Sequence, residues 1–195
     1  MIDKAVLRKQ LRRARMSLPR SVRTKAARLV AKRILRAGYL RKFSRIAFYW
    51  PVGSELDTRP LAALARSLGR ELYLPRIARH RRLRFDVWNG RVPHRKNCHG
   101  IQEPRPLNTL LPRQIELVVL PLVGFDQQCR RLGQGGGYYD SSFAYRARAA
   151  AIKRPFLLGL AFECQRAEVI PCEPWDIRLD AVISERRHYR RGFPA

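Results

Sequence analysis

The sequence predicts a single three-layer α/β/α domain with a largely parallel central sheet. Short apolar runs alternate with helical patterns, which is typical of such a fold. The chain has 195 residues, which is enough for one buried core but short for two independent ones. Hydrophobic residues make up 46% of the sequence. No apolar run approaches the roughly 18 residues that cross a membrane. We therefore expect one domain over residues 1–195 and no membrane segment.

The N-terminal quarter predicts two basic helices. In the first, apolar residues recur at helical spacing, and Lys4 and Arg8 lie one turn apart on a neighbouring face. This helix should end near Pro19. Ser21 can cap a second helix, which Gly38 is suited to end.

A strand–helix rhythm follows. Residues 46–50 form a β-branched and aromatic run, typical of a buried strand, and Glu55 should lie just beyond its end. The other expected elements are helices over residues 61–68 and 141–151 and strands over residues 72–74, 117–120, 156–162 and 181–183.

Two segments depart from this rhythm. Between residues 80 and 111, an alternating run and the pair Asn89-Gly90 predict a hairpin or an extension of the sheet edge, with the turn at that pair. The basic tail over residues 186–191 is expected to be weakly ordered.

A glycine cluster follows the strand at 117–120. Residues 131–140 read RLGQGGGYYD, with glycine at positions 133, 135, 136 and 137. Glycine main chain allows a close approach, so this loop is suited to direct N–H groups at an anion, with Arg131 adding positive charge. A tight connection without a ligand is the alternative. The loop is neither a Walker A motif nor a GxGxxG motif.

The charge of the chain is strongly positive. Lys and Arg number 41 against 15 Asp and Glu, giving a net charge of +26, and Asp3 is the only acid before Ile46. This excess indicates one of three things: nucleic-acid binding, a surface that attracts anionic substrates, or a compositional bias without function.

The cysteines show no paired spacing. Cys98, Cys129, Cys164 and Cys172 are expected to be free thiols, as in a reducing cytoplasm. His94, Cys98 and His99 lack a fourth ligand at convincing spacing, so we expect no metal site there.

Four motifs, in order along the chain, together carry a family resemblance. They are residues 4–8 (KAVLR), 55–58 (ELDT), 131–140 (RLGQGGGYYD) and 176–180 (DIRLD). With them the chain resembles the 5-formyltetrahydrofolate cyclo-ligase family, also called 5,10-methenyltetrahydrofolate synthetases, over almost its whole length. The resemblance implies a fold similar to that of sugar-phosphate isomerases and coenzyme A transferases.

The resemblance also implies a reaction. Such enzymes couple ATP hydrolysis to closure of 5-formyltetrahydrofolate, giving 5,10-methenyltetrahydrofolate, ADP and phosphate. Phosphoryl transfer to the formyl oxygen makes an iminium phosphate, which the neighbouring nitrogen attacks. This chemistry needs positioning and charge neutralisation more than a protein nucleophile. Mg²⁺ is the implied metal.

The implied site residues form overlapping sets. Lys4, Arg8 and Arg131 would be catalytic through their charges. ATP would be held by Lys4, Ala5, Val6, Leu7, Arg8, Arg131, Leu132, Gly133, Gln134, Gly135, Gly136, Gly137, Tyr138 and Tyr139. Folate would be bound by Arg8, Trp50, Glu55, Gln134, Gly135, Gly136, Gly137 and Tyr138. Asp140 and Asp176 would serve the metal.

Simpler roles for these side chains stay open. Asp140 could cap a helix, Asp176 could pair with Arg178 or Arg187, and the three aromatic residues Trp50, Tyr138 and Tyr139 could be core packing. Some relatives have Lys where Gly136 stands, which would shift the cationic role here to Arg131 and the N-terminal pair.

Two other functions compete with the enzyme. One is a basic nucleic-acid-binding protein without cyclo-ligase activity, although the chain has no RNP, KH or helix-turn-helix signature. The other is an ATP-binding relative with a changed acceptor. For the enzyme, we expect a monomer that acts on the folate and its polyglutamates, with non-specific attraction for polyanions.

Overall fold

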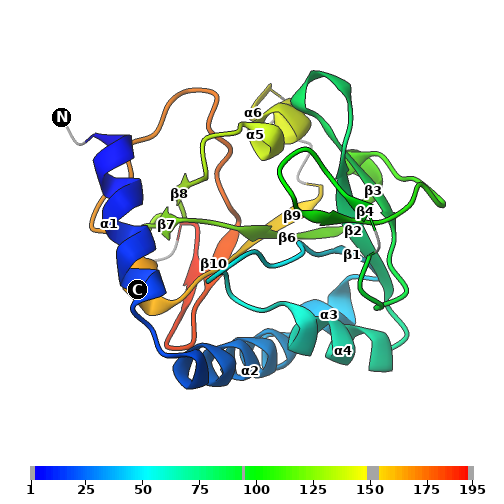
Figure 1. The fold of residues 1–195 in the computed structure, drawn as a ribbon, viewed down its shortest axis with the longest axis horizontal. Helices are drawn as coiled ribbons and strands as arrows, with labels where there is room; N and C mark the ends of the chain where they lie inside the picture. Colours follow the sequence, from blue (N-terminus) through cyan, green and yellow to red (C-terminus); the bar gives the residue numbers. More distant parts are fainter. Residues whose placement is uncertain (1–2, 94, 149–153, 193–195) are drawn as a thin grey trace.

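A computed structural model describes residues 3–93, 95–148 and 154–192 (Figure 1). The main sheet contains β1 (Arg45–Ala47), β2 (Glu71–Ile77), β3 (Leu83–Val87), β6 (Leu117–Pro121), β9 (Phe156–Leu160), β10 (Ala181–Ile183) and β11 (His188–Arg190). These seven strands lie in the order β11-β10-β9-β6-β1-β2-β3. All neighbours pair in parallel except the two edge strands, β3 and β11, which are antiparallel. The expected largely parallel sheet is confirmed.

Helices cover both faces of the sheet. The first face carries α2 (Arg20–Arg36), α3 (Tyr39–Lys42) and α4 (Arg59–Ser67), and the second carries α5 (Tyr138–Phe143) and α6 (Tyr145–Arg148) (Figure 1). Successive strand residues alternate between the two apolar cores, as Val118 and Val119 do. The three-layer arrangement is therefore confirmed.

The helix α1 (Lys4–Met16) stands at one end of these layers (Figure 1). It packs on a small third cluster that includes Leu11, Val123, Leu132 and Ile170. Beside it lie the two-stranded ribbon β7 (Gly124–Phe125) and β8 (Arg131–Leu132) and the 3₁₀ helix η3 (Glu163–Gln165). This position leaves the inner face of α1 turned toward the carboxyl ends of the central strands.

Several element boundaries differ from the expected ones, among them those of α4, β2 and β9, and two further differences have a clear physical reason. The helix α2 begins at Arg20 with Pro19 as its N-cap residue, so Ser21 lies inside the first turn and is not the cap. The fixed φ of proline already sets the helix entry there. The strand β1 ends at Ala47 rather than Trp50: Phe48 N still donates to Tyr73 O, and the chain then leaves the sheet.

The segment after β2 also differs in its turns. The strand β3 extends the sheet edge as expected, but the turn between β2 and β3 is the 3₁₀ helix η1 (Arg79–Arg81), not Asn89-Gly90. A separate antiparallel ribbon joins β4 (Arg95–Lys96) to β5 (Gln102–Glu103). A further 3₁₀ helix, η2 (Pro112–Gln114), leads into β6.

Two further expectations fail near the C-terminus. The tail expected to be weakly ordered contains β11, because Tyr189 is 3% exposed and its ring lies 5.1 Å from that of Phe125. The helix expected over 141–151 begins earlier, at Tyr138, and is divided at Ala144. Residues 149–151 of that prediction lie outside the described residues, as does His94.

No helix within the described parts of the chain is long and apolar enough to cross a membrane.

Candidate functional site

A cleft of about 1740 Å³ lies between α1, the loop after β1, the β4–β5 ribbon and the glycine loop, Gly133–Gly137. It takes in most of the expected site residues. Those that line it are Lys4, Arg8, Trp50, Glu55, Arg131, Leu132, Gly133, Gln134, Gly135, Gly136, Gly137, Tyr138, Tyr139, Asp140 and Asp176. Ala5, Val6 and Leu7 are not part of the lining, although they belong to the helix turn that carries Lys4 and Arg8.

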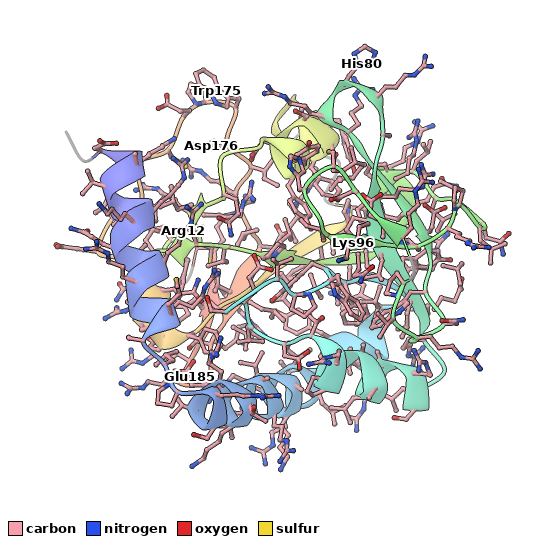
Figure 2. The ribbon with its side chains drawn as sticks, viewed as in Figure 1. Arg12, His80, Lys96, Trp175, Asp176 and Glu185 are labelled. Atoms are coloured by element: carbon pink, nitrogen blue, oxygen red, sulfur yellow. The ribbon has the colours of Figure 1, made fainter. Side chains whose placement is uncertain are left out.

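Lys4 joins the first turn of α1 to a loop near the C-terminus. Its Nζ lies 2.8 Å from Asp176 Oδ2 and 3.6 Å from Glu173 Oε1. Burial alone would lower the pKa of Lys4, but the hydrogen bond and charge of Asp176 outweigh it and raise that pKa. Asp176 therefore pairs with Lys4, rather than with Arg178 or Arg187. Figure 2 shows Asp176 on this loop beside the more exposed Trp175.

Two arginines of α1 hold the glycine loop. Arg8 Nε donates to Gly133 O at 2.9 Å, and Arg12 Nη2 donates to Gln134 Oε1 at 2.5 Å. Figure 2 shows Arg12 on the side of α1 turned toward the rest of the molecule. These bonds fix the position of the loop against the helix.

Arg131 is buried and paired. Its Nη2 donates to Asp140 Oδ1 at 2.6 Å, and its guanidinium lies 5.8 Å from the ring centre of Tyr139. The same Asp140 oxygen accepts from Ile177 N at 3.1 Å. Asp140 thus connects the glycine loop to the segment after Asp176, and it is not the N-cap residue of α5, which is Gly137.

The two expected metal ligands each keep one free oxygen. Asp140 Oδ2 and Asp176 Oδ1 have no hydrogen-bond partner among the residues that the structure describes. Within the same residues, no group of three or more His, Cys, Asp or Glu side chains is arranged to hold a metal. Such a pair fits Mg²⁺ only if phosphate oxygens and water complete its shell, which is a common arrangement for this ion. We name Lys4, Arg131, Asp140 and Asp176 the paired end of the cleft.

The glycine loop uses glycine at two positions for its backbone. Gly135 has φ +106° and Gly137 has φ +69°, both unfavourable for residues with a Cβ. A Cβ on Gly136 would instead lie 3.0 Å from the Tyr138 ring. The loop is therefore shaped by backbone conformation as well as by the need for space.

The other end of the cleft carries Glu55 and Trp50. Glu55 Oε2 accepts from Val52 N at 3.0 Å, and Glu55 Oε1 accepts from Gln134 Nε2 at 3.3 Å. Burial raises the pKa of Glu55, while these donors and the charge of Arg15 oppose that shift. Trp50 lines the cleft and packs edge-on against Trp88, with ring centres 6.1 Å apart.

Several lining residues had not been expected from the sequence. Arg15 is 6% exposed, and its Nε donates to Ser54 Oγ at 3.0 Å. His99, from the β4–β5 ribbon, bonds Tyr138 OH at 2.7 Å. Arg12 and Arg15 could have been found by continuing the helical spacing of Lys4 and Arg8, whereas nothing in the sequence indicated His99. We name Arg15, Trp50 and Glu55 the open end.

Comparisons with known proteins agree over nearly the whole chain. A model described as the 5-formyltetrahydrofolate cyclo-ligase family matches residues 1–185. The chain is 29% identical over 182 residues to the 5-formyltetrahydrofolate cyclo-ligase of Haemophilus influenzae, covering 91% of this chain and 95% of that protein. It is 31% identical over 147 residues to the protein of the same name from Escherichia coli K12, covering 71% of this chain and 76% of that one.

Solved structures give the same result. The structure of Aquifex aeolicus 5,10-methenyltetrahydrofolate synthetase matches with a TM-score of 0.82 at 25% identity, over 98% of this chain and 94% of that one. The Mycoplasma pneumoniae synthetase matches in fold, with a TM-score of 0.74 at 23% identity, over 94% and 99% of the two chains. From the family model and these relatives, this chain belongs to the 5-formyltetrahydrofolate cyclo-ligase family.

Proposed function

We propose that the protein closes 5-formyltetrahydrofolate to 5,10-methenyltetrahydrofolate, using ATP and Mg²⁺ and releasing ADP and phosphate. The observation that carries this proposal is a single cleft that joins a cationic glycine loop to a carboxylate and an indole. One ligand at each end would meet the other beside Gln134, which contacts both α1 and Glu55.

The nucleotide would lie at the paired end. The N–H groups of the glycine loop are suited to phosphate oxygens, and Lys4, Arg8 and Arg131 supply positive charge around them. Because Arg131 is held by Asp140, its charge has a fixed position before any ligand arrives. Fixed charges stabilise a phosphoryl-transfer transition state without reorganising during the reaction.

Asp140 and Asp176 would hold Mg²⁺ through their free oxygens, together with phosphate oxygens and water. When bound, the ion would neutralise charge on the phosphates. The chain's own contribution is to hold the two carboxylates in place, Asp140 through Arg131 and Asp176 through Lys4.

The folate would lie at the open end. The Glu55 carboxylate is suited to accept hydrogen bonds from an amino-substituted pterin ring, and the indole of Trp50 can pack against its face. Arg8 and the residues Gln134–Tyr138 would border the formyl group. The polyglutamate forms of the folate would be drawn by the same positive field.

The reaction would then run in two steps. The formyl oxygen attacks the terminal phosphorus of ATP, ADP leaves, and the carbon becomes an iminium phosphate. The neighbouring folate nitrogen attacks that carbon and releases its proton to solvent. The carbon–oxygen bond breaks, and phosphate takes the oxygen and its electron pair. The chain supplies orientation and charge in both steps and no covalent nucleophile.

The direct test is turnover with purified protein, watched by the absorbance of the methenyl product. We expect product only when 5-formyltetrahydrofolate, ATP and Mg²⁺ are all present. The absence of product from a folded sample with all three would rule out the proposal.

All four cysteines are free thiols, which suits our proposal of a cytoplasmic enzyme. We also propose a monomer, because one chain is enough to form the cleft.

A nucleic-acid-binding role is the second candidate, favoured by the net charge of +26. Duplex affinity should fall steeply with salt if the attraction is only electrostatic. Binding that survives near-physiological salt and depends on nucleic-acid shape, without cyclisation, would favour this role over the enzyme.

A further inference from the structure

Arg15 is a mostly buried arginine whose terminal nitrogens have no partner among the residues that the structure describes. The residue is 6% exposed, and its single side-chain hydrogen bond within the described chain is the one from Nε to Ser54 Oγ. No carboxylate of the described residues forms an ion pair with it. The terminal nitrogens are not among the buried atoms that lack a partner, so they reach the cleft, and their hydrogens stay available to an acceptor that enters it.

Glu55 is the acidic side chain that shares the open end of the cleft with Arg15. Each of its oxygens accepts one hydrogen bond, from Val52 N and from Gln134 Nε2, which leaves acceptor capacity on both. Burial lowers the pKa of Arg15, and the attraction of Glu55 counters this, so the two charges influence each other without touching. Both side chains line the cleft. The open end therefore presents a carboxylate and a guanidinium that form no ion pair with each other and keep hydrogen-bonding capacity for a ligand.

This pair matches one edge of a reduced pterin. The 2-amino group and N3–H are donors, and the 4-oxo oxygen beside them is an acceptor. A carboxylate next to a guanidinium offers the complementary order of two acceptors and a donor. A ring with an amino group at position 4 would instead present a donor to Arg15.

We propose that Arg15 donates to the 4-oxo oxygen of the pterin and so sets the specificity of the site for the 2-amino-4-oxo ring. The proposal rests on the proposed function, in which Glu55 accepts from the amino edge of the same ring. The folate's glutamate carboxylates are the competing acceptor. Arg15 favours the ring because it shares the open end with Glu55.

The first test measures binding of 5-formyltetrahydrofolate without nucleotide, by calorimetry. Arg15→Met keeps the apolar stem and removes the charge, and we expect it to weaken binding about 10- to 100-fold, the scale for a hydrogen bond to a charged donor. Arg15→Lys should recover part of the loss. Arg13→Met is the matched control, because Arg13 is an exposed arginine on the same helix that does not line the cleft, and it should bind like wild type.

The second test changes the ligand. A 5-formyltetrahydropterin without the glutamate tail should show the same ratio between wild type and Arg15→Met. A 2,4-diamino analogue should bind wild type more weakly than the 2-amino-4-oxo compound, and Arg15→Met should lose that preference. The wild-type comparison needs no variant, so it remains informative if a substitution unfolds the protein.

Three outcomes would overturn the inference. If wild type and Arg15→Met bound the tail-less ligand equally well, Arg15 would contact the glutamate tail of the folate rather than the ring. Unchanged preference between the two rings in a folded Arg15→Met protein would leave the arginine with a structural role. No binding of any folate by wild type would remove the inference and the proposed function together. Folate binding with the expected preference but no turnover would remove only the function.

Discussion

Each end of the cleft contains both basic and acidic side chains. These side chains form ion pairs at one end and do not at the other. At the paired end, Lys4 contacts Asp176 and Arg131 contacts Asp140, at 2.8 and 2.6 Å. At the open end, Arg15 and Glu55 lie on the same wall without an ion pair. Internal pairs hold a site rigid before a ligand binds, whereas unpaired groups leave hydrogen-bonding capacity to the ligand. We infer that the paired end supplies preorganisation and the open end supplies recognition.

The largest effect on stability and rate is expected from a substitution at the paired end. Arg131→Ala removes one partner of a buried pair, and the free energy of unfolding should fall by about 3 kcal/mol. The single-turnover rate should also fall by about 100-fold or more, because a fixed donor is lost. Denaturant titration and rapid-quench measurements test the two effects separately.

The double variant Arg131→Ala/Asp140→Ala is the control for that experiment. It should regain part of the stability, since the unpaired carboxylate is gone, but none of the rate. A single variant as stable as wild type would mean that the pair does not hold the paired end together.

A smaller effect is expected when the proposed metal ligands, Asp140 and Asp176, are changed. Asp140→Asn and Asp176→Asn should each reduce Mg²⁺-dependent turnover by about 10- to 100-fold, because an amide oxygen holds the ion less well than a carboxylate. Titrating Mg²⁺ at saturating ATP should shift the half-maximal concentration upward. Asp57→Asn is a suitable control, because Asp57 pairs with exposed Arg59 and does not line the cleft.

If either variant lost stability and activity in the same proportion, with no shift in the Mg²⁺ titration, that carboxylate would serve the fold alone.

Substitutions in the glycine loop should have smaller effects on ATP affinity and on stability. Gly136→Ala places a Cβ 3.0 Å from the Tyr138 ring, so we expect ATP affinity to fall by several-fold as the ring shifts. Gly137→Ala meets no neighbouring atom but must adopt φ +69°, which costs about 1 kcal/mol of stability. Equilibrium ATP binding and thermal unfolding distinguish the two causes. Equal ATP affinity in wild type and both variants would remove the loop from the nucleotide site.

The smallest expected effect is a pH dependence confined to the open end. Burial raises the pKa of Glu55, so folate affinity should fall as the pH drops through that raised value. The folded protein takes up this proton more readily than the unfolded chain, so the same titration should increase the free energy of unfolding as the pH drops. Affinity and stability should therefore change in opposite directions.

Glu55→Gln removes the titrating group and should flatten both profiles over that range. A profile for folate affinity that is identical in wild type and Glu55→Gln would assign the pH dependence to another group.

Local patterns in the sequence predicted the layers of the fold, and most of the site residues that the family resemblance implied line one cleft. Strand burial follows from runs such as residues 117–120, and the glycine loop follows from its composition. The element ends were less accurate: Phe48 keeps a sheet hydrogen bond after β1 has ended, and the order of β11 depends on its contact with Phe125. These depend on neighbours that are distant in sequence.

Pairing inside the site was beyond local reasoning for the same reason. Pairing with Arg178 or Arg187 was the alternative to a metal-binding role for Asp176, and its ionic partner is instead Lys4. The position of Arg15 depends on the loop that carries Ser54. The helical spacing of Lys4, Arg8, Arg12 and Arg15 contained part of this information, since it places all four on one face of α1.

The contact between Lys4 and Asp176 has a consequence for the order in which the protein is made. The two residues are 172 positions apart, so α1 leaves the ribosome long before its partner loop exists. Closing so long a loop is entropically costly until the intervening sheet has assembled. A nascent chain therefore carries a basic helix without its carboxylate partner through most of synthesis, and the paired end of the cleft can form only after residue 176 emerges.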